Sequence, residues 1–311
     1  MILTVTMNVA IDKSYVLICK NKPGEVLRVA ECRATPGGKG LNVAKAVRAL
    51  GEDVVATGII GGHAGSWVEE NLAHKGVRCD FERAAGESRT CINIIEPDGR
   101  QTEFLEPGLQ VDADTTAAFL RRFQRLLASS AAVTISGSLP QGMPTDFYAE
   151  LISRCRAADK PVLLDTSGLL LRQGVQTKPT MIKPNLEELG QLTGHTVSGS
   201  VSDVMENARQ LYQAGIGMVV VSMGARGAVV VCGEGAFHAA PPAIEAVSAT
   251  GSGDSMTAGF AVGIVRGWPV QRTLRFATAA AAANALELET GRVNMDNVNR
   301  LYDQVVINSI D

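Results

Sequence analysis

The sequence predicts an α/β fold, in which a mostly parallel β-sheet is flanked by helices on both faces and a small β-sheet stands off this core. Strand-like and helix-like stretches alternate over most of the 311 residues, which is typical of such folds. Repeated strand–helix units with short connections imply a mostly parallel sheet with helices on both faces. Two segments, 16–35 and 88–106, lack a helical period and are predicted to be extended.

Hydrophobic periodicity and turn residues assign the elements in order. Ile2–Met7 is a β-branched run, and apolar residues at 41, 43, 44, 47 and 50 predict an amphipathic helix that ends at Gly51. The predicted elements are strand 2–7, helix 40–50, strand 54–60, helix 66–75, helix 112–128, strand 131–136, helix 144–158, strand 161–166, strand 181–183, helix 185–193, helix 202–214, strand 218–221, strand 229–232, and helices 254–266, 270–286 and 295–306.

The two extended segments are predicted to form the small sheet. Asp98-Gly99 lies between the strand-like arms 91–95 and 101–105, which is a strong β-hairpin signal. We expect residues 1–311 to form one α/β domain that carries this sheet.

Composition excludes several classes of protein. The net charge is −3 and no Lys/Arg block occurs, so neither a nucleic acid nor an anionic membrane is an expected partner. No apolar run approaches the ~18–20 residues that span a bilayer. The six cysteines are scattered without a C-x-x-C pair, which predicts reduced thiols and a cytoplasmic protein.

A glycine-rich segment, Pro36–Ala44, starts the helix 40–50. Gly38 lets the backbone approach a ligand, and the helix N-terminus supplies free amides with a partial positive charge. Lys39 adds a full charge, and Asn42 lies on the same face one turn later. The segment suits a phosphate or a polyol, unless it is a plain turn with a surface lysine. It is not a P-loop, because G-x-x-x-x-G-K-[ST] occurs nowhere in the chain.

A second glycine-rich segment starts the helix 254–266. The backbone amides of Gly251, Ser252 and Gly253 are predicted to form a nest for a transferring phosphoryl group. Asp254 would accept or orient the proton of an attacking hydroxyl. The alternative is that the helix dipole simply favours an acid there. The same dipole is expected to lower the pKa of Asp254.

Two further turns follow predicted strands. Lys183-Pro184-Asn185 opens a helix in which Asn185 and Glu188 could hold Mg²⁺ through water, although a capping box is the favoured interpretation of the spacing. Ser222-Met223-Gly224-Ala225-Arg226-Gly227 is either a nucleotide-contacting turn or a β-turn. Nothing local distinguishes these two.

A last group of candidates contains charged residues outside the glycine-rich segments. Arg89, before the hairpin, and Arg28, in the extended segment, are candidate clamps for a substrate phosphate. Surface arginine is the commoner case for either residue. Asp12, after the first strand, either accepts sugar hydroxyls or ends the strand.

Together and in this order, the motifs resemble the PfkB family of ribokinase-like carbohydrate kinases over essentially the whole chain. GGKGLNVA at 37–44 is similar to the N-terminal signature of the family, and ATGSGDSMTAGF at 249–260 to its C-terminal signature. SGSLP at 136–140, KPN at 183–185 with Glu188, and SMGARG at 222–227 also match. The hexose-phosphate branch is the most similar. Within it, MILTVTMNVAID at the start, RQTEFLEPG at 100–108 and TGRVNMDNV at 290–298 look most like tagatose-6-phosphate kinases.

The resemblance implies a role for each candidate. Asp254 would be the catalytic base, beside an anion hole at Gly251, Ser252 and Gly253. The family usually has alanine where Ser252 stands. The sugar phosphate would be held by Asp12, Gly38, Lys39, Asn42, Arg89 and Ser138, with Arg28 as a further candidate. ATP would be bound by Lys183, Asn185, Ser222, Gly224, Gly227 and Gly253, and Mg²⁺ by Asn185 and Glu188.

The same resemblance implies the reaction and the assembly. It implies phosphorylation of a ketohexose phosphate by ATP with Mg²⁺, and it leaves a monovalent cation open. Tagatose 6-phosphate is the expected substrate, with fructose 1-phosphate and fructose 6-phosphate as alternatives. A non-catalytic sugar-phosphate sensor is the alternative from another class, and the intact Asp254 turn argues against it. The small sheet would be a lid over the active site and would pair in a homodimer.

Overall fold

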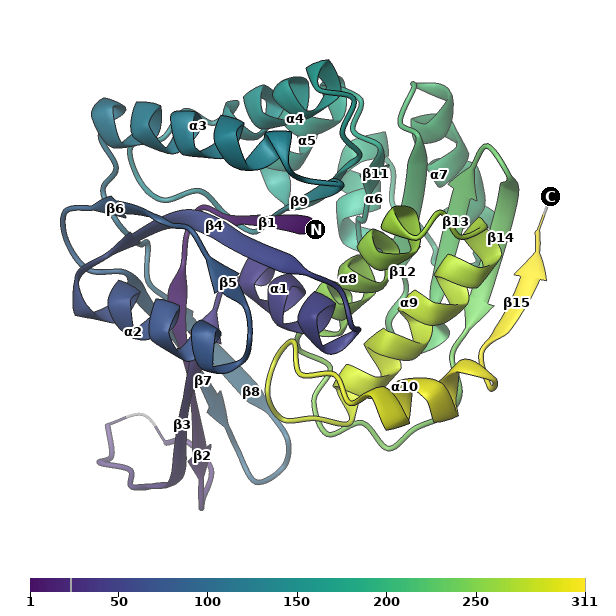
Figure 1. Cartoon of the computed structure of the whole chain (residues 1–311). Coiled ribbons are helices and arrows are strands. Elements are labelled where there is room, and N and C mark those ends of the chain that lie inside the picture. The colour runs from purple at the N-terminus through teal and green to yellow at the C-terminus, as the bar shows by residue number, and fades with distance from the viewer. Residues whose placement is uncertain (23, 311) are drawn as a thin grey trace.

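Two β-sheets and their helices make up the structure, a computed structural model that describes residues 1–22 and 24–310. Within these residues the larger sheet has eleven strands and the smaller has four. Figure 1 shows helices on both faces of the larger sheet and the smaller sheet projecting from it. The predicted α/β fold class is therefore confirmed.

The larger sheet is parallel at its centre and antiparallel at one edge. Its strands, in spatial order, are β15 (Val306–Ser309), β14 (Gly235–Ala240), β13 (Ala228–Cys232), β12 (Met218–Ser222), β11 (Met181–Ile182), β10 (Val162–Asp165), β9 (Ala132–Ser136), β1 (Ile2–Thr6), β4 (Val54–Gly61) and β5 (Arg78–Cys79), with β6 (Glu82–Ala84) also paired to β4. β1 pairs in parallel with both β4 and β9, and β9 with β10. The carboxyl ends of β1, β9 and β10 therefore meet at one edge.

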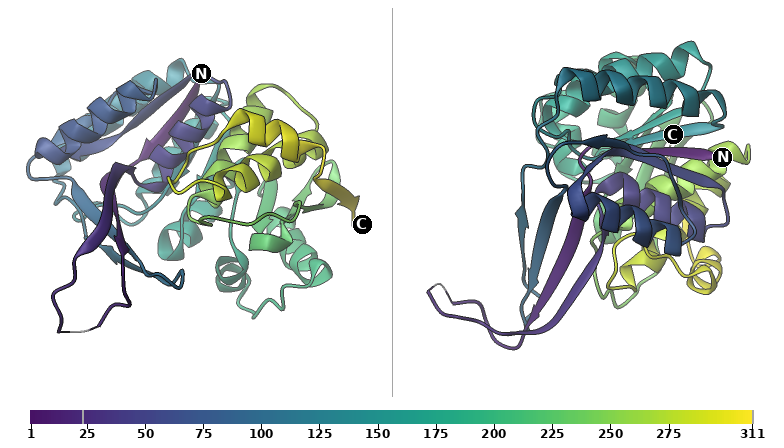
Figure 2. Two further views of the ribbon diagram at one scale, coloured as in Figure 1. Left: turned by 90° about the horizontal axis from the view of Figure 1, so that it is seen from below. Right: turned by 60° about the vertical axis from the view of Figure 1, so that its left-hand side comes forward.

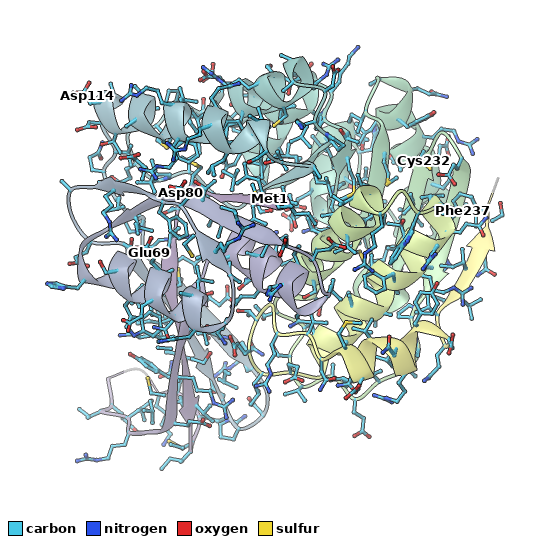
Figure 3. All side chains as sticks on the ribbon, viewed as in Figure 1. Met1, Glu69, Asp80, Asp114, Cys232 and Phe237 are labelled. Atoms are coloured by element: carbon cyan, nitrogen blue, oxygen red, sulfur yellow. The ribbon has the colours of Figure 1, made fainter. Side chains whose placement is uncertain are left out.

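Helices cover the sheet in two groups. One face carries α1 (Lys39–Ala49), α2 (Gly62–His74), α8 (Ser252–Val265), α9 (Val270–Ala285) and α10 (Met295–Tyr302), and the other carries α3 (Ala113–Ala128), α4 (Phe147–Ala157), α5 (Gly168–Gln176), α6 (Leu186–Thr193) and α7 (Val201–Gln213). Side chains of β1 alternate between the two faces, so Ile2 packs with the first group and Leu3 with the second. Figure 3 shows side chains between the sheet and the helices on both of its faces.

Small residues set the position of α8 against its neighbours. A Cβ placed at Gly259 would lie 2.5 Å from the Cα of Ala277 in α9, so only glycine permits this close approach. Ten residues of α8, from Asp254 to Gly263, are buried. The start of the helix is therefore held firmly at the sheet edge.

The smaller sheet joins two hairpins that are distant in sequence. Its strands, in spatial order, are β3 (Val29–Gly37), β2 (Ala10–Leu17), β7 (Arg89–Ile95) and β8 (Gln101–Leu105). The predicted hairpin at Asp98-Gly99 is confirmed as β7 and β8, and β2 pairs in parallel with β7. Figure 2 shows that this sheet stands away from the core. The predicted segment 16–35 starts too late, because β2 begins at Ala10, and its residue 23 lies outside the described residues.

Several element boundaries differ from the prediction. The helix expected over 295–306 ends at Tyr302, because Val306–Ser309 pairs with β14 as an edge strand. α5 and β14 were not predicted, and α2 begins at Gly62 rather than at residue 66. Among the described residues, no helix is long and apolar enough to cross a membrane. The six cysteines carry free thiols.

Candidate active site

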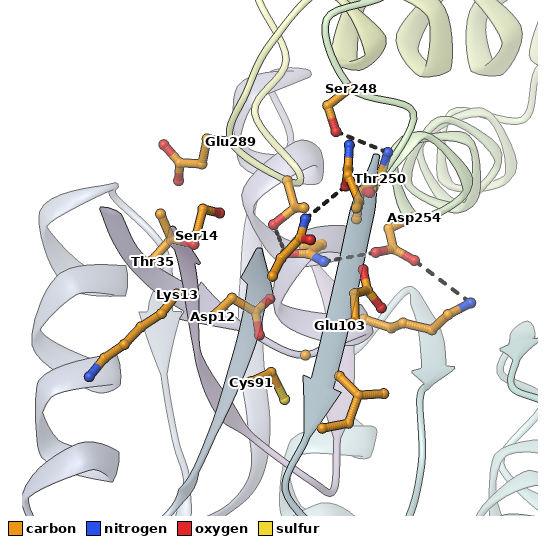
Figure 4. Close-up of a pocket in the computed structure, with 18 of the residues that line it drawn as sticks. Asp12, Lys13, Ser14, Thr35, Cys91, Glu103, Ser248, Thr250, Asp254 and Glu289 are labelled. Atoms are coloured by element: carbon orange, nitrogen blue, oxygen red, sulfur yellow. Dashed lines mark hydrogen bonds and ion pairs between the residues drawn. The ribbon is translucent and has the colours of Figure 1, made fainter. Parts of the chain in front are cut away.

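A cavity of about 1120 Å³ lies between the small sheet and the edge where the strands of the larger sheet end. The wall contains residues from the ends of β1 and β9, from the starts of α1 and α8, from the small sheet and from the loop between α9 and α10. Figure 4 shows labelled side chains around it, including Asp12, Glu103, Asp254 and Glu289. Ligands in open α/β folds bind at this kind of edge.

Both predicted glycine-rich segments begin a helix at this cavity. Gly38 is the N-cap of α1 with φ 105°, and Gly251 is the N-cap of α8 with φ 87°. Both angles lie in the left-handed region, which favours glycine. The two helix N-termini therefore present free amides to the same space.

Asp254 lies in the first turn of α8 and is buried. Its Oδ2 accepts a hydrogen bond of 2.8 Å from the Nδ2 of Asn42, which lies 212 residues earlier in the chain. Its Oδ1 lies 4.0 Å from the Nζ of Lys39. The structure thus joins the two segments through one carboxylate that faces the cavity (Figure 4).

The expected lowering of the Asp254 pKa is wrong. Burial raises the pKa of Asp254 to about 6, and the nearby Asp165 carboxylate acts in the same direction, against Lys39, Asn42 and Lys183. Desolvation outweighs the stabilisation that the helix start provides. The carboxylate is still mostly ionised at neutral pH. It is also a stronger base than an exposed aspartate, which suits proton abstraction.

The loop between α9 and α10 sets the orientation of Asn42. The hydroxyl of Thr290 donates a hydrogen bond of 3.1 Å to the Oδ1 of Asn42, so the amide nitrogen faces Asp254. A Cβ placed at Gly291 would lie 2.6 Å from the Asn42 carbonyl oxygen, and one at Gly251 would lie 2.9 Å from the Gly291 nitrogen. This loop is therefore wedged between the starts of both helices.

Asp165 is a charged residue of the site that sequence reasoning missed. It ends β10, and its side chain is 1% exposed. Its carboxylate lies 2.9 Å from the Nζ of Lys39 and 3.2 Å from the Nζ of Lys183, and it accepts a hydrogen bond of 3.1 Å from Thr257 of α8. Burial opposes ionisation, but the two lysines outweigh it and lower the pKa of Asp165. The signal in the sequence that could have identified Asp165 is an acidic residue at the end of a buried strand.

Two lysines extend from Asp165 toward the start of α8. The carboxylates of Asp165 and Asp254 outweigh burial and raise the pKa of Lys39, which therefore stays charged. Lys183 is buried, and a Cβ placed at Gly253 would lie 3.2 Å from its Nζ. Two cations and the first-turn amides of α8 therefore surround one small space, a suitable environment for a phosphoryl group.

Asp12 and Gly38 form part of the wall on the side of the small sheet. Asp12 lies in β2, and a Cβ placed at Gly37 would lie 2.1 Å from its Cγ, so glycine is required there. Burial raises the pKa of Asp12, although Lys45 and Arg89 act in the opposite direction. Its carboxylate is an acceptor for hydroxyl groups.

Arg89 and Ser138 line the same part of the cavity. Arg89 starts β7 and donates to the backbone oxygens of Glu106 at 3.0 Å and Asn8 at 3.3 Å. Its Nε is buried without a partner. The Oγ of Ser138 accepts a hydrogen bond of 3.1 Å from Asn8. An anion near Arg89 would satisfy the unpaired donor.

The structure does not bring every candidate to the cavity. Arg28 is exposed between β2 and β3, outside the cavity wall, so its predicted place in the sugar-phosphate site is not supported. The reason is that the strand register carries this part of the segment away from the core.

The predicted nucleotide-contacting residues Ser222, Gly224 and Gly227 also lie outside the cavity wall. The Ser222 amide donates a hydrogen bond of 3.0 Å to the Pro184 oxygen. The SMGARG and KPN turns are therefore neighbours.

Asn185 and Glu188 form a complete capping box at the start of α6. The Asn185 Oδ1 accepts from the Glu188 amide at 2.8 Å, and a Glu188 carboxylate oxygen accepts from the Asn185 amide at 2.9 Å. This is the interpretation that the spacing favoured. Among the described residues there is no cluster of three or more His, Cys, Asp or Glu side chains that would enclose a metal ion. The pair fits Mg²⁺ only through water.

Comparison with known proteins agrees with this geometry. The family model described as "pfkB family carbohydrate kinase" matches residues 5–296. Phosphofructokinase-2 from Escherichia coli, solved in complex with potassium, is 27% identical with a TM-score of 0.89, over 97% of this chain and 98% of that one. A putative phosphofructokinase from Staphylococcus aureus is 27% identical with a TM-score of 0.86, over 100% and 99% of the two chains. A possible 1-phosphofructokinase from Thermotoga maritima is 25% identical with a TM-score of 0.86, over the full length of both chains. This protein belongs to the pfkB family of carbohydrate kinases.

Proposed function

We propose that this kinase transfers a phosphoryl group from ATP to a ketohexose phosphate, with tagatose 6-phosphate as its main substrate and tagatose 1,6-bisphosphate as the product. The observation that carries the proposal is the buried Asp254 carboxylate, held by Asn42 at the point where two helix N-termini open into one cavity. One helix start would hold the accepting sugar and the other the transferred phosphoryl group.

The reaction follows from this arrangement. The sugar hydroxyl loses its proton to the Asp254 carboxylate as its oxygen forms a bond to the γ-phosphorus. The bond between that phosphorus and the β–γ bridging oxygen breaks, and ADP leaves with the electron pair. Amides of Gly251, Ser252 and Gly253, with Lys39, stabilise the charge on the equatorial oxygens.

The remaining candidates would serve binding. Asp12, Gly38, Asn42 and Ser138 are placed to hold the sugar, and Arg89 to pair with its existing phosphate. ATP would be contacted by Lys183, Asn185, Ser222, Gly224 and Gly227. Mg²⁺ neutralises phosphate charge when it is bound, and Asn185 and Glu188 would hold it through water. The potassium complex of the Escherichia coli enzyme supports a monovalent cation as a further cofactor.

An ADP-release assay tests the proposal. Tagatose 6-phosphate, fructose 1-phosphate, fructose 6-phosphate, ribose and adenosine would each be supplied with ATP and Mg²⁺. We expect the highest kcat/KM with tagatose 6-phosphate. No ADP release with any acceptor, together with a rise in melting temperature on adding a sugar phosphate, would instead identify a non-catalytic sensor.

A second candidate substrate is fructose 1-phosphate. It is favoured by the full-length similarity to the possible 1-phosphofructokinase from Thermotoga maritima. Tagatose and fructose are epimers that differ in the orientation of one hydroxyl group. The ratio of kcat/KM for the two sugar phosphates distinguishes these assignments, and fructose 6-phosphate is the third acceptor to compare.

Replacing Arg89 with alanine is expected to raise the KM for the sugar phosphate about 10- to 100-fold, because a hydrogen-bonded charge pair is lost. The KM for ATP should change less than about twofold, since Arg89 lies at the sugar end. Arg100→Ala is the matched control, because Arg100 lies in the turn between β7 and β8 and pairs with Glu96 outside the cavity wall. An equal rise in both KM values would place Arg89 elsewhere.

The small sheet would act as a lid within a single domain and as the contact of a homodimer. Apolar side chains outside the cavity wall are exposed on it and on its connecting loop, at Ile18, Val26, Val29 and Phe104. Exposed apolar patches commonly mark contact surfaces. Light scattering coupled to size-exclusion chromatography is expected to give twice the chain mass, and Phe104→Glu should lower it. A monomeric or tetrameric wild-type protein would contradict the dimer.

A further inference from the structure

A buried lysine lies behind the cavity wall. Lys45 follows Asn42 by one turn on α1, its side chain is 4% exposed, and it does not line the cavity. Its Nζ donates a hydrogen bond of 3.0 Å to the Pro36 oxygen and lies 3.8 Å from the Glu289 Oε1. Burying an ammonium group is costly unless opposite charges compensate it. The groups around the Nζ of Lys45 therefore determine whether it stays charged.

The small sheet and the loop between α9 and α10 meet at this ammonium group. Pro36 belongs to β3 of the small sheet, and Glu289 to the loop between α9 and α10. Asp12, in β2, is close enough for its charge to raise the pKa of Lys45. Both Asp12 and Glu289 line the cavity, and Figure 4 shows them beside it. Lys45 therefore lies behind two carboxylates that face the substrate space.

The contact with Glu289 leads to the catalytic carboxylate. Glu289 precedes Thr290, which donates to Asn42, and Asn42 in turn donates to Asp254. The same loop is in close contact with the starts of α1 and α8, as the tight positions of Gly251 and Gly291 show. A shift of Glu289 would consequently move the hydrogen bond that orients Asp254.

We propose that Lys45 is a positioning residue for phosphoryl transfer, which couples the small sheet to the Asp254 turn. It binds the Pro36 carbonyl of β3, the strand paired to the β2 strand that carries Asp12, and it contacts Glu289 in the loop on the other side. The inference rests on the proposed function, because Asp12 is taken to bind the acceptor sugar. Movement of the small sheet onto a bound sugar would then act on the loop that aims Asn42 at Asp254.

The charge of Lys45 is set by the groups around it. Burial lowers the pKa of Lys45 to about 8, assisted by Lys75 and opposed by Glu289, Asp12 and Asp254. Lys75, which follows α2, lies 2.8 Å from the same Oε1 of Glu289 and is 38% exposed. Lys45 is therefore charged at neutral pH and loses its proton slightly above it, so the coupling should fail on the alkaline side.

Lys45→Met and Lys45→Arg test the inference. Lys45→Met removes the charge with little change in shape, and we expect the KM for the sugar phosphate to rise about tenfold and kcat to fall about tenfold. The KM for ATP should stay within about twofold, and calorimetry should show the same weakening of sugar-phosphate binding. In Lys45→Arg, activity near neutral pH should be largely retained while the alkaline loss near pH 8 disappears, because arginine stays charged.

Lys75→Met is the matched control, since it removes the other cation at the Glu289 Oε1. It leaves the hydrogen bond from Lys45 to Pro36 in the small sheet in place. It should change neither KM value by more than about twofold. If Lys45→Met and Lys75→Met changed kcat and KM equally, Lys45 would be only a structural contact of Glu289. An alkaline limb that persists unchanged in Lys45→Arg would overturn the inference even if Lys45→Met fails to fold. A wild-type protein inactive on every acceptor would refute the proposed function instead.

Discussion

Replacing Asp254 with asparagine is expected to lower kcat by at least about 10³-fold, because the variant lacks the base that accepts the hydroxyl proton. Binding of the sugar phosphate should remain largely intact. The side chain keeps its shape, and its amide oxygen can still accept the hydrogen bond from Asn42. Steady-state kinetics with ATP and calorimetry of sugar-phosphate binding give the two quantities separately.

The pH dependence of kcat provides the control for this variant. Wild-type kcat should fall as the pH drops below about 6, since burial raises the pKa of Asp254 to about 6 and protonation removes the base. The residual activity of Asp254→Asn should show no such acid limb. Glu103→Gln removes another carboxylate of the same cavity, and we expect less than about a tenfold change in kcat. Turnover of Asp254→Asn near the wild-type level would remove Asp254 from the mechanism.

Asp165→Ala is expected to lower the free energy of unfolding by about 3–5 kcal/mol, the usual cost of removing one partner of a buried ion pair. Asp165 lies 3.2 Å from Lys183, whose side chain is only 5% exposed. Without the carboxylate, this ammonium group would remain buried without its counter-charge. Lys39 is 44% exposed and can turn to solvent, so it adds little to the loss.

Urea denaturation at neutral pH measures this effect. The double variant Asp165→Ala/Lys183→Met should recover part of the lost stability, since the unpaired cation is replaced by an apolar side chain of similar length. A loss below about 1 kcal/mol in Asp165→Ala would contradict a stabilising role for the ion pairs at the end of β10. The same conclusion would follow if the double variant lost more free energy of unfolding than the sum of the losses in Asp165→Ala and Lys183→Met.

Local sequence was sufficient to predict the elements that a few neighbouring residues specify. The apolar period of α1, the glycine before α8 and the Asp98-Gly99 hairpin each lie within a few residues, and all three elements were predicted. The strand β15 was not predicted, because Val306–Ser309 is extended only through its pairing with β14. β2 was placed too late for the same reason, since its first residues pair with β7 from another part of the chain.

The charged residues of the site show a similar division. Asp254 and Lys39 were predicted because each stands beside a glycine that begins a helix. Asp165 was missed, because nothing near it in sequence indicates that Lys39, Lys183 and Thr257 converge on its carboxylate. Arg28 was placed at the site by its charge alone, and the strand register carries it away.

By itself, the sequence determined that two helices each begin at a glycine, and that an aspartate lies in the first turn of one of them. These are properties of a few consecutive residues, so spacing reveals them. The tertiary structure alone decided that Asn42 of one start donates a hydrogen bond to Asp254 of the other, and that the pKa of Asp254 is raised rather than lowered. The reason is that desolvation and the charges of Lys39 and Asp165 depend on packing between segments far apart in the chain.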